Sequence, residues 1–175
     1  MAQASQFYGD VIFQGGVAFA GTVTLPNSVV GNAQVAAAAN IASSKVLHRF
    51  SRSKQLYAPG TTIVSLASEL LHLARKGGEV VGFEAVITTQ ATGGDRTVSV
   101  DLQKSTAGGA FATILSSPIS LTNATVIRTA VAGVISSAAF VDGDIFQAVI
   151  SVAGAAGAQA AGLLITADFD QNPNT

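Results

Sequence analysis

In Thr97-Val-Ser-Val-Asp-Leu-Gln-Lys104, polar and apolar residues alternate from Thr97 to Gln103. In an extended chain, successive side chains point to opposite faces, so Val98, Val100 and Leu102 fall on one face and polar side chains on the other. A strand with one apolar and one polar face belongs to a sheet that is buried on one side. The stretch therefore predicts one layer of an antiparallel β structure.

Similar segments surround this stretch at spacings of about eight to twelve residues, separated by turn signals such as Gly108-Gly109 and Asp142-Gly143-Asp144. We predict further strands at 61–66, 69–75, 79–90, 111–115, 118–121, 125–131, 134–136, 144–153 and 160–169. Residues 65–76 also fit a short helix, but the following Lys76-Gly77-Gly78 hairpin signal favours a strand. The pattern predicts an all-β fold, an antiparallel β-sandwich of jelly-roll-like type, over residues 59–175.

The uncharged run from Ala148 to Ala167 is long enough to suggest a membrane span. It contains Gly154, Gly157 and Gly162, which favour two strands around a glycine-rich turn. The opening Met1-Ala-Gln-Ala-Ser-Gln6 lacks the basic start and the apolar core of a secretory signal. We therefore expect no association with a membrane.

Three six-residue units, 9–14, 15–20 and 21–26, share the pattern G-x-V-x-(F/L)-x. This period predicts short β repeats whose apolar positions share one side: Val11, Phe13, Val17, Phe19, Val23 and Leu25. Burial of six side chains offsets less free energy than ordering the eighteen residues costs. We therefore expect these positions to form a trimer or shell interface.

An Ala-rich segment, 28–45, and a basic segment, 45–54, follow the repeats. Between Asp10 and Glu69 the chain has no acidic residue, and four cations fall within ten positions: Lys45, Arg49, Arg52 and Lys54. These side chains either contact an acidic partner surface or keep a linker soluble. The turn signal around Pro59-Gly60 suggests a boundary at 58/59, with residues 1–58 forming an extended N-terminal arm.

Composition points toward assembly. Charged residues make up only 11% of the 175 residues, and the net charge is −1. So much neutral surface is uncommon on a monomer and favours a homo-oligomer or a subunit of a larger particle. The overall charge argues against nucleic-acid binding. The chain contains no cysteine, which excludes disulfides and thiolate chemistry.

The sequence contains few candidate catalytic or metal-ligating residues. His48 and His72 have no second histidine or carboxylate at metal-ligand spacing, and we expect a surface or packed histidine at each position. The Asp142-Gly143-Asp144 segment lacks the further oxygen ligands of a calcium loop. Nucleophile-elbow, Walker and dinucleotide motifs are absent, and the chain has no Trp and two Tyr to form sugar platforms. We expect neither an enzyme nor a cofactor.

The run from Leu25 to Val35, continued by Ala39-Asn40-Ile41 and Lys45-Val46-Leu47-His48, resembles a segment of virion structural proteins of tailed bacteriophages. In those proteins the segment often follows short G-x-V-x-(F/L) repeats and precedes a β domain. Three later segments resemble the β-sandwich of capsid decoration (cement) or head-fibre proteins: Val98–Lys104, Ile114–Ile119 and Asp142–Ile145. Val46 stands where Leu is common in that family.

The resemblance implies a homotrimer on the outer capsid surface, with an N-terminal arm that binds the major capsid protein. We expect a structural virion protein of this kind, with shell contact by charge at the four cations of the basic segment. The alternative is the receptor-binding tip of a tail fibre or baseplate appendage. For that alternative a glycan ligand is possible but has no support in the sequence.

Overall fold

The computed structural model describes residues 48–172, and this part of the chain is built from ten strands without a helix. The strands are β1 (His48–Thr62), β2 (Leu66–Leu73), β3 (Gly78–Thr89), β4 (Thr97–Ser105), β5 (Ala112–Thr113), β6 (Ile119–Thr122), β7 (Val131–Ala132), β8 (Ala139–Phe140), β9 (Ile145–Ala153) and β10 (Ala161–Gln171).

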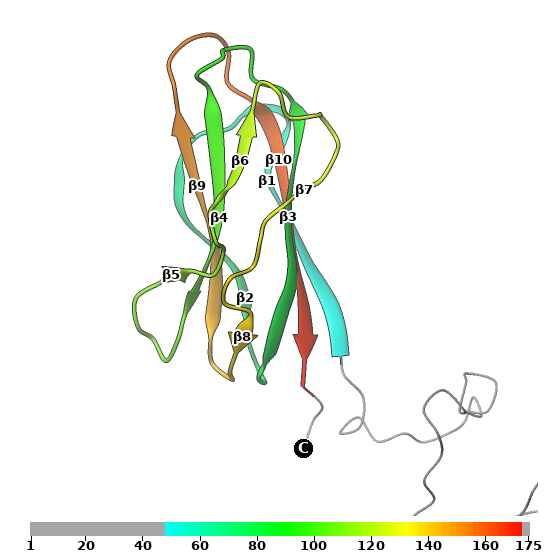
Figure 1. The fold of residues 1–175 in the computed structure, drawn as a ribbon, viewed down its shortest axis with the longest axis vertical. Coiled ribbons are helices and arrows are strands. Elements are labelled where there is room, and N and C mark those ends of the chain that lie inside the picture. The colour runs from blue at the N-terminus through cyan, green and yellow to red at the C-terminus, as the bar shows by residue number, and fades with distance from the viewer. Residues whose placement is uncertain (1–47, 173–175) are drawn as a thin grey trace, which may run out of the picture. The chain divides into compact units, whose positions relative to one another are not determined.

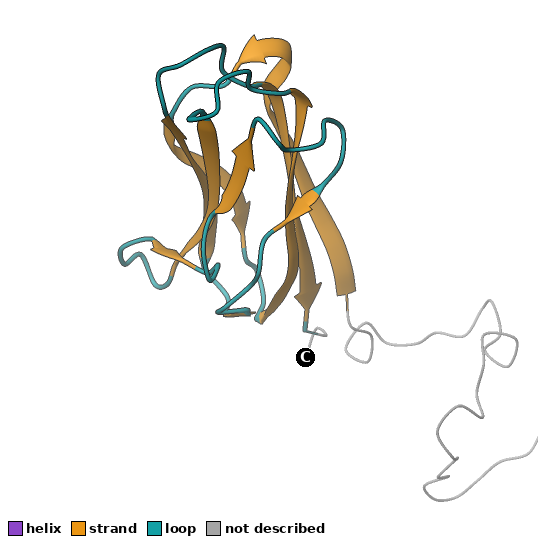
Figure 2. Cartoon of the chain, turned by 45° about the horizontal axis from the view of Figure 1, so that its top comes forward, coloured by secondary structure: helices purple, strands orange, loops and turns teal. Residues whose placement is uncertain are grey.

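The strands form two antiparallel sheets that pack face to face (Figures 1 and 2). Sheet A has the order β1-β10-β3-β7, with β8 also on β3, and sheet B has the order β2-β9-β4-β5, with β6 also on β4. Early strands thus pair with late ones, β1 with β10 and β2 with β9, and the chain changes sheet at each step from β1 to β4. This is the strand order of a jelly roll, which confirms the predicted fold class.

The core lies between the sheets and consists of the apolar side of each alternating strand. Val98, Val100 and Leu102 of β4 are fully buried, as the opening pattern predicts. In β3 the buried positions change phase between Val80 and Phe83, because the register with β10 shifts there. This bulge places both side chains in the core, and a strictly alternating strand would expose one of them.

Aromatic rings fill the end of the sandwich where β1 begins and β10 ends. The ring of Phe169 lies 5.1 Å from that of Phe146, 5.3 Å from that of Phe50 and 5.8 Å from that of Phe140. His72 of β2 joins this cluster, with its ring 4.8 Å from Phe169. The cluster therefore connects the edge strands of both sheets to the core.

Most predicted strands are present within a few residues of their expected bounds. Segment 65–76 contains a strand, β2, and the apolar run 148–167 contains the end of β9, a turn and the start of β10. Three predicted strands are wrong. Residues 61–66 span the end of β1 and the start of β2, with 63–65 outside both strands, and 134–136 contain only an isolated bridge, Leu115↔Ile135. In the third, 125–131, only Val131 lies in a strand. Arg128 has a left-handed backbone, with φ of 57°, and its N–H donates to the carbonyl of Ile87, so this segment is a loop.

β1 is the largest difference from the expected organisation. The boundary drawn at 58/59 falls inside this 15-residue strand, which pairs with β10 from His48↔Gln171 onward. Residues 48–58, assigned to the arm, are therefore part of the sandwich. Charged residues and proline are tolerated on an edge strand, because one side of the strand forms no ladder hydrogen bonds. The charges and Pro59 made the composition of this segment resemble that of a linker.

Candidate interaction surfaces

The predicted interface residues fall into two groups. The six repeat positions Val11, Phe13, Val17, Phe19, Val23 and Leu25 and the cation Lys45 lie outside the described residues, and their roles stay predictions. Arg49, Arg52 and Lys54 lie on β1. Because side chains alternate along a strand, Arg49 lies on the outer face of sheet A, whereas Arg52 and Lys54 point toward the opening between the two sheets. The fold thus divides the basic segment between two surfaces.

Arg49 forms a two-point ion pair with Asp170 of β10. Its Nε lies 2.6 Å from Oδ1 and its Nη2 lies 2.7 Å from Oδ2. The hydrogen bonds, aided by charge attraction, raise the pKa of Arg49 and lower the pKa of Asp170. This two-point geometry is characteristic of a guanidinium paired with a carboxylate. The positive charge of Arg49 is thus compensated by a carboxylate of its own chain.

Arg52 and Lys54 have different surroundings. The guanidinium of Arg52 lies 5.2 Å from the ring centre of Phe50, and among residues 48–172 it forms no ion pair. Lys54 pairs with Glu69 of β2 and donates to the carbonyl of Leu70 at 3.2 Å, which joins the edge strands of the two sheets. Arg52 is thus the described cation of the basic segment that keeps its charge available.

A cleft of about 510 Å³ opens beside Arg52, between β1 and β2. It is lined by Phe50, Arg52, Leu71, His72, Leu73, Arg75 and Gln171, and we call it the basic cleft. Its lining holds two arginines and no carboxylate. Burial, with a smaller effect of Arg52, lowers the pKa of His72, so this imidazole is held neutral and packed against aromatic rings.

An apolar area adjoins the basic cleft and shares three of its residues. A hollow of about 340 Å³ is lined by Leu70, Leu71, His72, Leu73 and Ile145, and we call it the leucine patch. Leu70 is 60% exposed and Leu73 is 40% exposed. Two large exposed leucines on an edge strand mark a surface suited to contact with another chain.

The outer face of sheet A carries four carboxylates, which we call the acidic face: Glu79, Glu84, Asp168 and Asp170. Glu79 lies directly opposite Asp170, and like charges in such a pair repel. Arg49 compensates part of this charge through its ion pair with Asp170, and the hydroxyl of Ser51 donates a hydrogen bond to Asp168. The exposed Glu79 and Glu84 form no ion pair within the described residues.

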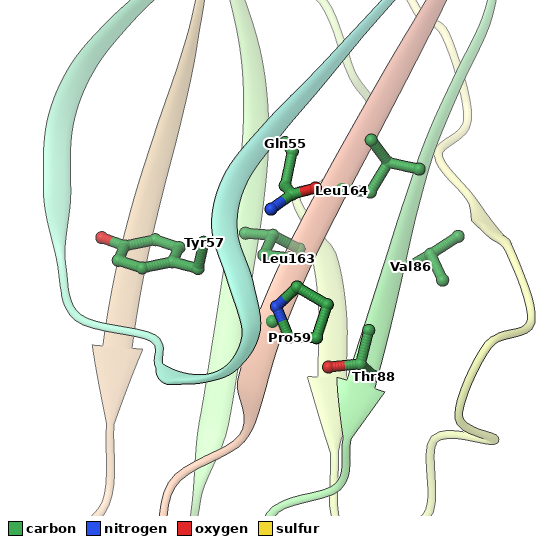
Figure 3. Close-up of a pocket in the computed structure, with 8 residues that line it drawn as sticks. Gln55, Tyr57, Pro59, Val86, Thr88, Leu163 and Leu164 are labelled. Carbon is green, nitrogen blue, oxygen red and sulfur yellow. The ribbon is translucent and has the colours of Figure 1, made fainter.

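The same outer face of sheet A also has an apolar hollow of about 160 Å³. Gln55 of β1, Leu164 of β10 and Val86 of β3 lie in one row across the three strands (Figure 3). The hollow is also lined by Tyr57, Pro59, Thr88, Gly162 and Leu163. Leu164 is 39% exposed. The outer face of sheet A therefore combines an acidic area with an apolar one, as the β1–β2 side combines a basic area with an apolar one.

The outer face of sheet B differs, because its side chains bond to one another. Ser68 donates to Gln147, Gln147 to Gln103 and Gln103 to Asp101, at 2.6, 3.0 and 2.9 Å, and Thr113 donates to the other oxygen of Asp101 at 2.6 Å. This chain of bonds crosses four strands. The alternation in 97–104 placed Asp101 and Gln103 on the outer face, but it gave no signal for these hydrogen bonds, which depend on strand neighbours distant in sequence.

Asp142-Gly143-Asp144 forms the predicted turn, with φ of 88° at Gly143. Within residues 48–172, no group of three His, Cys, Asp or Glu side chains is arranged to hold a metal ion. The described part of the chain also has no helix that is long and apolar enough to cross a membrane. What the described residues do offer is surfaces with opposite charge, each beside exposed apolar side chains.

Comparison with protein-family models and with curated proteins finds no match. Among solved structures, the chain is similar to a chain of infectious bursal disease virus, Gt strain, with a TM-score of 0.32 and 17% identity over 75% of this chain and 39% of that one. A chain of the Gx strain gives a TM-score of 0.31 and 13% identity over 74% and 37%. The chain thus spans less than two fifths of these viral chains, and a likeness of this size carries no argument about function.

Proposed function

We propose that this chain is a structural virion protein, a homotrimeric decoration (cement) protein that binds the major capsid protein shell of a tailed bacteriophage and stabilises it. The supporting observation is that a jelly-roll sandwich begins at residue 48, directly after the segment that resembles such virion proteins. Jelly rolls are frequent in viral capsid and lectin domains, which is support by analogy of fold.

The proposed mechanism is adhesive and involves no catalysis or cofactor. Residues 1–47, with the three apolar repeats and Lys45, bind the shell, and the sandwich lies on the outer capsid surface. Arg49 and Lys54 contribute less to shell contact than their sequence position suggests, because each pairs with a carboxylate of its own chain. Apolar burial by the repeats is the main source of affinity.

The test is the amount of this protein in purified particles, measured against the major capsid protein by quantitative mass spectrometry. A decoration protein is present in hundreds of copies, whereas a receptor-binding fibre tip is present in tens or fewer. The full chain should bind particles that lack it, and a chain without residues 1–47 should not. Absence from particles, or a fibre-like copy number, contradicts the proposal.

A further inference from the structure

We propose that two surfaces of the sandwich bind each other between copies of this chain: the β1–β2 side of one copy docks on the outer face of sheet A of the next. The β1–β2 side consists of the basic cleft and the leucine patch. The opposing surface consists of the acidic face and the apolar hollow around Leu164.

The first argument is charge complementarity. Arg52 and Arg75 line the basic cleft, whose lining has no carboxylate, and Glu79 and Glu84 stand exposed on the acidic face. Within residues 48–172 none of these four side chains has an ion-pair partner. Charges of opposite sign on two surfaces of one chain favour self-association and fix its register.

The second argument is the apolar area that adjoins each charged area. Leu70 and Leu73 are exposed beside the basic cleft, and Leu164 is exposed on the outer face of sheet A. An interface needs such apolar anchors, because exposed ion pairs by themselves contribute little free energy. A surface that bears both kinds of side chain can exclude water around its charges.

The third argument selects the partner. A nucleic acid drawn to the arginines would be repelled by the four carboxylates of the neighbouring sheet face, whereas a second copy provides the matching carboxylates. Because the two surfaces differ, the contact is heterologous, and such contacts close into a ring when the rotation between copies permits. The ring size of three rests on the proposed function, while the contact itself does not.

Charge reversal in the full chain tests the contact by sedimentation velocity. Arg52→Glu with Arg75→Glu should weaken self-association at least tenfold, and Glu79→Lys with Glu84→Lys should do the same. The fourfold variant, with both reversals in one chain, should regain most of the wild-type affinity. Arg128→Glu, at an exposed position in the loop between β6 and β7, is the control and should have no effect.

Two results overturn the proposal. One is an unchanged association constant in both double variants. The other is a fourfold variant that associates no more strongly than either double variant, because restored association is expected only if these arginines and carboxylates face each other across the contact. Melting curves of the variants, close to wild type, show that the fold is retained.

Disulfide trapping gives an independent readout, since the chain has no cysteine. Arg75→Cys with Glu84→Cys in one chain should yield covalent oligomers under oxidation, whereas either single variant should not. Ser151→Cys with Glu84→Cys, which uses the exposed outer face of sheet B, is the control. Equal trapping in the control contradicts the proposed contact. These measurements use no virus particles. They can therefore contradict the contact between copies while the particle test supports the decoration role, or support the contact while the particle test contradicts that role.

Discussion

Asp144 is a buried charge whose partner the sequence does not reveal. It is 1% exposed, its Oδ2 accepts from the N–H of Val141 at 3.1 Å, and the same oxygen lies 3.4 Å from Nζ of Lys104. Lys104 also donates to the carbonyl of Ala139 at 2.6 Å. This lysine therefore joins β4 to the β8–β9 turn.

Removal of Lys104 should destabilise the protein strongly. Lys104→Met leaves the Asp144 carboxylate buried without a counterion, and the expected loss is about 3–5 kcal/mol of unfolding free energy. Urea denaturation measures it. The double variant Lys104→Met/Asp144→Asn, which has no buried charge, should recover more than half of the loss. A loss below about 1 kcal/mol for the single variant would show that water already solvates Asp144.

Gly162 is a position where a side chain cannot fit. Its φ is 65°, and a Cβ there would lie 2.1 Å from the hydroxyl oxygen of Thr88. Gly162→Ala should therefore cost about 1–3 kcal/mol for the left-handed backbone, with the clash in addition. Gly94→Ala is the matched control, because a Cβ at Gly94 meets nothing within 4 Å. Thermal unfolding of both variants compares them, and equal stabilities would contradict this explanation.

At the scale of elements, two adjacent residues before β4 hold the loop between β9 and β10. Asp95 accepts from the N–H groups of Ala155 and Ala156 at 3.0 and 3.2 Å. Arg96 donates to four carbonyls of the same loop, those of residues 154–157, at 2.7 to 3.3 Å. A glycine-rich turn thus gains order from charged side chains of another connection.

This loop should loosen in acid. Its N–H groups lower the pKa of Asp95, so the bonds contribute fully above the carboxyl's ordinary pKa and are lost as pH falls through the lowered folded-state value. NMR titration of the amides of Ala155 and Ala156 should report this transition. Asp95→Asn should abolish it, and Asp101→Asn, on the outer face of sheet B, should leave it in place.

β1 is the element that most changes the interpretation of the chain. It supplies Phe50 to the aromatic cluster and Arg52 to the basic cleft. Because side chains alternate along the strand, Arg49 lies on its opposite face, where it pairs with Asp170. A segment that reads as a soluble linker is therefore both an edge strand and part of two surfaces. Inward-pointing charges on such a strand also discourage unspecific edge pairing.

Truncation tests the role of β1. A chain that begins at residue 48 should fold and unfold cooperatively, because every described strand is retained. A chain that begins at residue 59 loses most of β1, exposes the edge of β10 and uncovers Phe169, so it should aggregate or lack a cooperative transition. Circular dichroism during heating separates the outcomes. Cooperative unfolding of the shorter chain would place β1 outside the folding unit.

For the whole molecule, the distribution of charge matters more than its sum. The net charge is −1, yet the jelly roll places arginines beside the opening between its sheets and carboxylates on the outside of one sheet. This separation is what the self-association proposal depends on. It also suggests that high salt weakens the contact, since exposed charges are screened beyond about one Debye length.

The sequence by itself determined the β-sandwich, because alternation of apolar and polar residues is a property of neighbouring positions. Val98, Val100 and Leu102 predict a buried strand face whatever the position of their strand in the sheet. It also indicated the turns at Gly77, Gly108 and Gly143. Only the tertiary structure decided that residues 48–58 are a strand, that Lys104 neutralises Asp144, and that Arg52 and Arg75 line one cleft. These depend on which distant strands become neighbours, and pairing between strands far apart in the chain leaves no local pattern to detect.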